Sequence, residues 1–241
     1  MSRVWWNALD QEPFVKYNKR PRSQALGVFM RIRLSIVWVF LLTALPGLIQ
    51  AKGWEEIGNE DGVKSFRKDV PGSKIVAFSG ETVIKASMER ILWVLMSNEH
   101  RKKWVHRLKD SRVLERKSKY SAIIYQEFGL PIPISNRDYV YQADVKRSGT
   151  GAIVDIRSTT HPKAPKTVGV RAYLRRCQYV LEPRGPGETF IRVEVHTDPK
   201  GLLPSWLVNL IQKKWPLNTL SGIRKMTQKT YAQEVALPPE G

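Results

Sequence analysis

The strongest constraint on the fold of this chain is a change of hydrophobic period near its C-terminus. Upstream, strand-like segments follow one another, whereas from Leu203 the apolar residues recur at helical spacing. They stand at Leu203, Leu207, Leu210, Leu217 and Leu220. This spacing predicts an amphipathic helix of about two dozen residues. Pro216 lies inside the helix, so a kink or a break is expected there.

The part of the chain before this helix is predicted to consist mainly of strands. They cover residues 62–68, 73–84, 111–115, 122–128, 138–146, 152–159, 168–181 and 189–197, with turn residues between them. One helix, over residues 87–97, interrupts the series. Hairpin-length connections favour an antiparallel sheet. The predicted fold class is therefore α+β: a curved antiparallel sheet, covered by the long C-terminal helix, around a space for one apolar molecule.

The only long apolar run, residues 34–45, lies near the N-terminus. It is too short for a comfortable membrane span, which needs roughly 20 residues. Met30 and two arginines precede it, Pro46-Gly47 follows it, and Ile49 and Ala51 occupy the minus-three and minus-one positions of a cleavage site. This is the pattern of a secretory signal peptide. The alternative is an uncleaved N-terminal anchoring helix.

These features divide the chain into three parts. Residues 1–29 are interpreted as an upstream extension that is disordered or not translated, and residues 30–51 as the signal peptide or anchor. Residues 52–241 form one domain, since no internal repeat or long linker divides them. The expected location of this domain is periplasmic or secreted, or the outer side of the inner membrane if the anchor is uncleaved.

The charge of the chain indicates an anionic partner. Forty basic residues against 22 acidic ones give a formal net charge of +18, which suits nucleic acid, a membrane surface or an anionic ligand. The densest basic cluster, residues 100–107, contains a single aromatic residue, Trp104. Nucleic-acid binding needs basic residues interleaved with several aromatics. We therefore expect an anionic membrane surface and no nucleic acid, with the cluster as either a solvated face or a headgroup site.

Motifs for catalysis, metal binding or cofactor binding are missing from the sequence. The four histidines form no H-E-x-x-H pattern, and there is no nucleophile elbow, P-loop or G-x-G-x-x-G. The single cysteine, Cys177, excludes an intrachain disulfide and a cysteine-based zinc site. We therefore expect no catalytic residue, no metal and no cofactor.

Two groups of polar residues stand within predicted strands. Asp155 lies in the middle of one strand, and Arg192, Glu194 and His196 share one face of the last strand. The opposite face of that strand carries Ile191, Val193 and Val195, which are interpreted as packing residues. The polar face is either exposed to solvent or part of a wet cavity wall.

Several segments together resemble the StAR-related lipid-transfer (START) domain, which has the helix-grip fold. They are Trp54 with Gly62-Val63, residues 100–104 (H-R-K-K-W), 133–140 (P-I-S-N-R-D-Y-V), 158–162 with 169–171, and 198–209 (D-P-K-G-L-L-P-S-W-L-V-N). In order and spacing these segments cover about residues 54–231. Their sequences are most similar to those of the phosphatidylcholine-transfer branch of the family. The resemblance implies a U-shaped antiparallel sheet around a hydrophobic tunnel, one lipid ligand for each monomer, and no chemical reaction.

The resemblance also implies roles for individual residues. Arg101 matches an arginine that binds the lipid phosphate, a task that suits the bidentate guanidinium fork. Tyr139 and Tyr141 match inward-pointing aromatics and share a strand face with Ala143. The predicted ligand-binding residues are Arg101, Tyr125, Gln126, Tyr139, Tyr141, Ala143, Asp155, Arg192, Glu194 and His196. The predicted gate combines the loop 161–168 with the C-terminal helix, through Pro162, Pro165, Trp206, Leu210 and Leu217.

At two positions the chain departs from the family pattern. Gln126 stands where the phosphatidylcholine carrier has a tryptophan of its choline cage, and Ala143 stands where sterol-binding relatives have a buried arginine. The resemblance therefore predicts neither choline selectivity nor sterol binding. Arg137 and Asp138 are interpreted as a structural ion pair at the start of a strand.

Two other functions remain open at the level of the sequence. A cyclase or hydrolase could occupy the same scaffold, because fold does not determine function; it would need Asp155, Glu194 or His196 inside the tunnel. A basic adaptor protein would have its interior filled by side chains, with no cavity above roughly 300 Å³.

Overall fold

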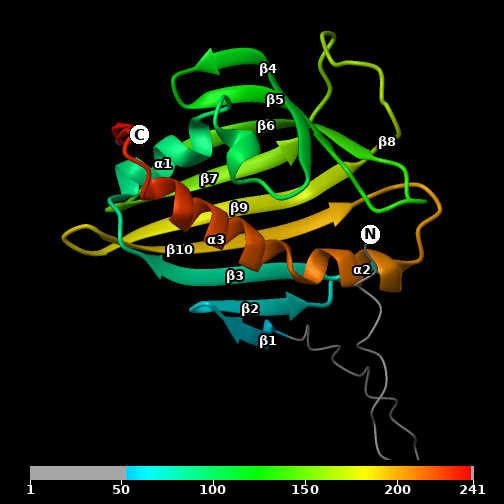
Figure 1. The fold of residues 1–241 in the computed structure, drawn as a ribbon, viewed down its shortest axis with the longest axis horizontal. Coiled ribbons are helices and arrows are strands. Elements are labelled where there is room, and N and C mark those ends of the chain that lie inside the picture. The colour runs from blue at the N-terminus through cyan, green and yellow to red at the C-terminus, as the bar shows by residue number, and fades with distance from the viewer. Residues whose placement is uncertain (1–52, 240–241) are drawn as a thin grey trace, which may run out of the picture. The chain divides into compact units, whose positions relative to one another are not determined.

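The computed structural model describes residues 53–239, which form one long sheet and three α-helices (Figure 1). The elements in chain order are β1 (Glu55–Glu60), β2 (Val63–Lys68), β3 (Ala77–Ile84), α1 (Met88–Met96), the short 3₁₀ helix η1 (Arg101–Lys103), β4 (Leu108–Ser118), β5 (Ser121–Phe128), β6 (Arg137–Ser148), β7 (Gly151–Ser158), β8 (Val170–Arg171), β9 (Tyr173–Gly185), β10 (Glu188–Asp198), α2 (Ser205–Lys213) and α3 (Trp215–Thr227). None of the helices in this part of the chain is long and apolar enough to span a membrane. The predicted signal segment, 30–51, and the extension before it lie outside the described residues.

The sheet is antiparallel along its whole path and is not closed. Its strand order is β1-β2-β3-β10-β9-β7-β6-β5-β4, and the two-residue strand β8 pairs with β6 in parallel. The eight predicted strand segments all lie on strands of this sheet, although the segment predicted as one strand over 168–181 is divided into β8 and β9. Strand β1 was not predicted. Its sequence, Glu-Glu-Ile-Gly-Asn-Glu, lacks the alternation that identifies a half-buried strand.

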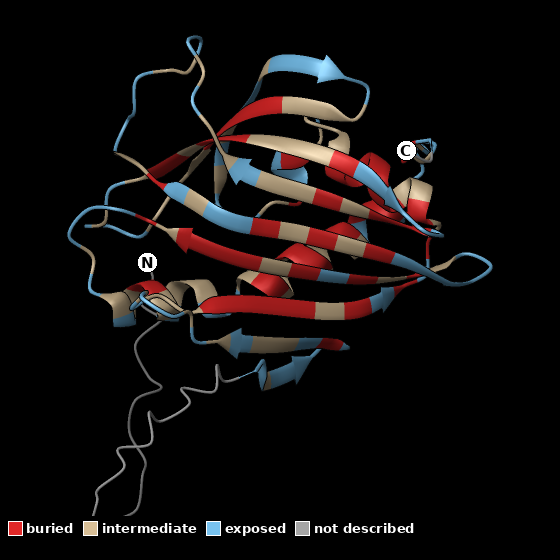
Figure 2. Ribbon diagram, turned by 180° about the vertical axis from the view of Figure 1, so that it is seen from behind, coloured by how far each residue is buried: buried red, intermediate tan, exposed pale blue. Residues whose placement is uncertain are grey.

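The C-terminal helices lie across one face of the sheet (Figure 1). Leu220 and Ile223 of α3 are fully buried in the main hydrophobic core. Gly80 on β3 allows this close approach, because a Cβ atom there would lie 2.6 Å from the Cβ of Pro216. Seen from behind, buried and more exposed residues alternate along β10 (Figure 2). The sheet therefore has an inner face that packs on the helices and an outer face that is largely polar.

The predicted C-terminal helix is confirmed, with the break that Pro216 led us to expect. Lys214 separates α2 from α3, and Pro216 occupies the first turn of α3, where its missing N–H would have no intrahelical partner. The two helices differ in burial, since only Val208 of α2 is buried. The backbone N–H of Val76 donates to Oδ1 of Asn209 at 3.2 Å, which connects α2 to the segment before β3. Helix α2 is thus the less firmly packed part of the cover.

Candidate functional site

A cavity of about 600 Å³ lies between the inner face of the sheet and the C-terminal helices. Strands β5, β6, β9 and β10 supply one wall, and α2 and α3 supply the other. Most of its surface is apolar, from residues that include Phe128, Leu130, Ile156, Leu174, Val195, Leu203, Val208, Leu210, Ile211 and Trp215. A cavity with this lining suits a ligand that is mainly apolar.

Arg101 is the most unusual residue of the cavity wall. It is only 6% exposed, although a guanidinium is always charged. Its Nη1 donates to the hydroxyl of Tyr141 at 3.2 Å, its Nη2 donates to the carbonyl of Leu95 at 2.6 Å, and its Nε has no hydrogen-bond partner. Within residues 53–239 no carboxylate is close enough to form an ion pair with it. A buried cation with only neutral partners carries a large desolvation cost, which makes it a favourable site for an anionic group.

Further polar groups surround the same space. The indole Nε1 of Trp104 and Oε1 of Gln212 are buried without a hydrogen-bond partner, and both residues line the cavity. The hydroxyl of Thr197 donates to the hydroxyl of Tyr139 at 3.2 Å. Burial raises the pKa of Tyr139 and of Tyr141 above the ordinary value, so both phenols are neutral. The cavity therefore offers an apolar wall with a few polar groups near one cation.

A smaller pocket, of about 50 Å³, reaches Arg101 from the side of β4 and β5. Arg101, Trp104, Ile156 and Tyr179 line both spaces. Ala143 faces this smaller pocket, together with Arg116 and Lys119. The guanidinium of Arg101 thus stands between the large cavity and a narrow basic recess.

The structure brings together five of the ten predicted ligand-binding residues. Arg101, Gln126, Tyr139 and Tyr141 line the large cavity, and Ala143 lines the recess. The side-chain amide of Gln126 donates to the hydroxyl of Ser111 at 3.3 Å. The strand period explains why these residues converge, since alternate residues of β6 face inward.

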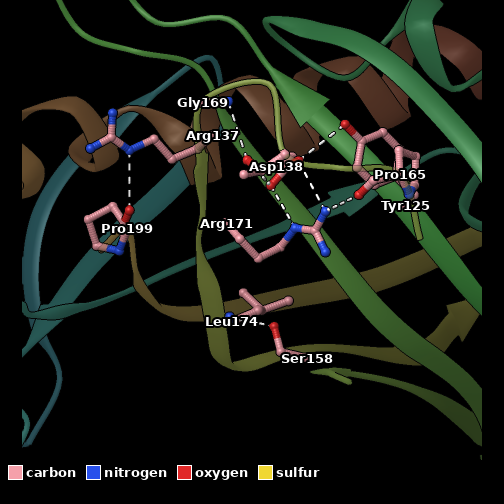
Figure 3. A network of polar contacts seen from close by, with 10 residues as sticks. Tyr125, Arg137, Asp138, Ser158, Pro165, Gly169, Arg171, Leu174 and Pro199 are labelled. Atoms are coloured by element: carbon pink, nitrogen blue, oxygen red, sulfur yellow. Dashed lines mark hydrogen bonds and ion pairs between the residues drawn. The ribbon is translucent and has the colours of Figure 1, made fainter. Parts of the chain in front are cut away.

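Tyr125 does not belong to this group. Because it precedes Gln126 on β5, its side chain points to the opposite face of the sheet. Its hydroxyl donates to Oδ2 of Asp138 at 3.3 Å, and Asp138 also accepts a bond of 2.7 Å from Nε of Arg171 (Figure 3). Burial and the negative charge of Asp138 raise the pKa of Tyr125 to about 12. Tyr125 is therefore a structural residue, and its prediction as a ligand contact is corrected.

The polar strand residues also lie on the outer face. Asp155 pairs with Arg157 at 2.6 Å, and Arg192 pairs with Glu81 at 2.9 Å. None of the residues that line the cavity comes from this polar set, whereas Val195, on the other face of β10, does line it. Of the two interpretations, the solvent-facing one is supported. The assignment of Asp155, Arg192 and Glu194 to the ligand site was wrong, because the inner wall takes the apolar residues of these strands.

His196 lies outside the cavity as well. Its Nε2 is 3.3 Å from the hydroxyl of Ser73, in the segment before β3. Burial, followed by the positive charge of Arg175, lowers its pKa below the ordinary value. Its prediction as a ligand contact is therefore corrected. Its contact with Ser73 connects β10 to the segment before β3, and that segment also binds Asn209 of α2.

The predicted gate residues occupy different environments. Leu210 lines the cavity from α2, Trp206 is 66% exposed, and Leu217 packs against the main core. The loop with Pro162 and Pro165 contributes no residue to the cavity wall. It is bound instead to the outer face, where the carbonyl of Pro165 accepts from Arg171 at 2.8 Å (Figure 3). In this structure α2 and α3 cover the cavity, and the two prolines lie outside its wall.

Several residues of the cavity wall were not predicted from the sequence, and one predicted ion pair does not form. Trp104 and Arg107, in the basic cluster that was left open as a headgroup site, line the cavity. Gln212 and Lys214 also line it, and neither was predicted to do so. The predicted ion pair between Arg137 and Asp138 is wrong, because neighbouring strand residues face opposite sides. Arg137 instead donates only to the carbonyls of Ser135, Pro199 and Lys200. Helical spacing within 203–220 was the one signal that could have indicated which residues of the cover face inward.

Comparison with known proteins identifies the family. The START domain profile matches residues 44–232. An uncharacterized protein of Pseudomonas aeruginosa is 31% identical over 186 residues, which cover 77% of this chain and 92% of that protein. The mouse phosphatidylcholine transfer protein is 26% identical over 185 residues, which cover 74% of this chain and 85% of that protein. The crystal structure of human STARD10 superposes with a TM-score of 0.68 at 25% identity and covers 74% of each chain. The predicted resemblance and the helix-grip fold are thereby confirmed, and the chain belongs to the START domain family.

Proposed function

We propose that the protein binds one lipid in the large cavity and transfers it between membranes, with the lipid phosphate at Arg101. The observation that carries this proposal is the buried guanidinium of Arg101, which has neutral partners only and an unpaired Nε at the end of an apolar cavity. Acyl chains would supply affinity at about 0.8 kcal/mol for each buried CH₂ group. The similarity to a phosphatidylcholine transfer protein supports the same function.

The two other functions considered from the sequence have less support. An enzyme on this scaffold was expected to use Asp155, Glu194 or His196, and all three lie outside the cavity wall. Among the cavity groups, burial, followed by the negative charge of Asp155, raises the pKa of Cys177 to about 12, which disfavours a thiolate nucleophile. An adaptor was expected to lack a cavity above roughly 300 Å³, whereas the large cavity measures about 600 Å³. We therefore propose a carrier that performs no reaction.

The proposal places this carrier outside the cytoplasm. Residues 30–51 would direct export to the periplasm or beyond, or would anchor a monomer to the inner membrane if they are not cleaved. The exposed Trp206 and Leu210 on α2 suit contact with a membrane, and opening of α2 there would release the lipid. N-terminal sequencing of the mature protein tests the export step. A mature chain that still begins upstream of residue 30 would contradict cleavage.

The lipid-binding proposal is tested with Arg101→Ala. We expect native mass spectrometry of the purified protein to show one co-purified lipid for each chain. The variant should lose more affinity for a phospholipid than for a neutral diacylglycerol, because only the phospholipid carries a phosphate. Arg157→Ala is the matched control, since Arg157 forms an exposed ion pair on the outer face. Equal losses for both lipids would remove the headgroup role, and protein from several hosts that is always empty would contradict the function.

A further inference from the structure

The charged residues that line the large cavity are all of one sign. Its wall includes the cationic side chains of Arg101, Arg107, Arg137 and Lys214. No aspartate or glutamate is among its lining residues in the described part of the chain. The small recess behind Arg101 adds Arg116 and Lys119, again without a carboxylate. A ligand in this space therefore meets positive charge from both sides of Arg101.

Two carboxylates that adjoin cavity-lining residues in the sequence, Asp198 and Asp138, pair with cations other than those of the wall. Asp198 is 2.9 Å from Nζ of Lys200 and 3.4 Å from Nη2 of Arg175. The carboxylate of Asp138 is fully buried on the other face of β6, where it pairs with Arg171 at 2.7 Å. Neither carboxylate is therefore available to balance the cations of the cavity or to receive a positively charged ligand group.

The cations of the wall differ in what they can offer to a ligand. Arg137 already donates from Nε, Nη1 and Nη2 to backbone carbonyls. Arg101 retains an unpaired Nε inside the cavity. Arg107 and Lys214 are exposed, so they belong to the rim, and neither forms an ion pair within residues 53–239. The available charge thus consists of one interior guanidinium and two cations at the rim.

We infer that the cavity selects lipids whose headgroup carries a net negative charge over zwitterionic lipids. This inference rests on the proposed function and specifies its substrate class. A zwitterionic headgroup would bring its ammonium group close to Arg101 and the rim cations, with no carboxylate to pair with it. The aromatic rings of the wall carry no formal charge, so they compensate an ammonium group less than a carboxylate would, and the Tyr141 hydroxyl already accepts a hydrogen bond from the guanidinium of Arg101.

The test is a competition between two lipids in one vesicle. The purified protein is equilibrated with vesicles of equimolar dioleoyl phosphatidylglycerol and dioleoyl phosphatidylcholine, then separated from them, and its bound lipid is identified by native mass spectrometry. At equilibrium the ratio of the two complexes reports the relative affinities of the cavity, whatever the protein's attraction to the vesicle surface. We expect phosphatidylglycerol to predominate. Each rim cation should contribute about fivefold, equivalent to about 1 kcal/mol.

Variants identify the source of the preference. The double variant Arg107→Gln with Lys214→Gln should lower the phosphatidylglycerol ratio roughly 25-fold, about fivefold for each cation removed. The matched control Lys85→Gln with Lys146→Gln removes the same charge from exposed positions outside the cavity wall and should leave the ratio unchanged. A ratio near one for the unaltered protein, or an equal fall in both double variants, would overturn the inference while lipid binding stands. Protein that binds neither lipid would instead contradict the proposed function.

Discussion

Replacement of Gly222 by alanine sets two opposing effects against each other in α3. Alanine improves helix propensity by up to about 1 kcal/mol. However, a Cβ atom at this position would lie 2.6 Å from the backbone carbonyl oxygen of Trp104, and ordinary contacts begin at 3.4 Å. A backbone oxygen cannot rotate away as a flexible side chain can, so α3 or the segment after η1 must move. Overpacking of this kind costs about 1–3 kcal/mol, and so close a contact belongs at the upper end.

The net effect of Gly222→Ala is therefore a loss of about 2 kcal/mol in the free energy of unfolding. For a domain of this size that loss lowers Tm by about 4–8 °C, which differential scanning calorimetry measures. Lys225→Ala, at an exposed position of the same helix, is the control and should shift stability by less than about 0.5 kcal/mol. Because Trp104 adjoins the cavity, lipid binding should weaken as well. An unchanged or higher Tm for Gly222→Ala would refute this reasoning, since propensity would then outweigh the contact.

Three further predictions concern the outer face and the cover. Asp138→Asn breaks the buried pair with Arg171 and should reduce the free energy of unfolding by about 3 kcal/mol in urea denaturation; a loss below about 1 kcal/mol would show that the pair is unimportant. Burial and Arg175 lower the pKa of folded His196, so stability should be complete above the unfolded value of about 6.5 and should decline as pH falls through the folded pKa. His196→Gln should flatten that decline in a series of pH-dependent melts, and an unaltered slope would assign it to other groups. Asn209→Ala removes the bond from Val76 and should speed lipid exchange and amide hydrogen exchange in α2 with little change in Tm; exchange at the original rate would mean that this bond does not hold the cover.

How well the sequence predicts a feature of this structure depends on how far apart along the chain the interacting residues lie. The break at Pro216 and the N-terminal end of α3 follow from local chemistry, so they could be predicted. The strand period places Tyr125 and Gln126 on opposite faces of β5, but it does not say which face is inside, because both faces of this sheet are covered in part. Asp138 has its partner 33 residues away, at Arg171. The period of a strand does not predict such long-range pairings, although it does exclude the pair of Arg137 with Asp138, because consecutive residues face opposite sides of the sheet.

The contrast between two buried charges supports a binding role for Arg101. Asp138 and Arg101 are both almost completely buried, and each would be costly without compensation. For Asp138 the fold supplies a guanidinium, the hydroxyl of Thr167 and the phenol of Tyr125. For Arg101 it supplies a phenol and one carbonyl, and Nε is left unpaired. The chain can therefore build a complete partner set for a buried ion where stability requires one. The incomplete set at Arg101, inside an apolar cavity, is typical of a site that gives up stability for binding. In the proposed function, an anionic headgroup would supply the missing partner.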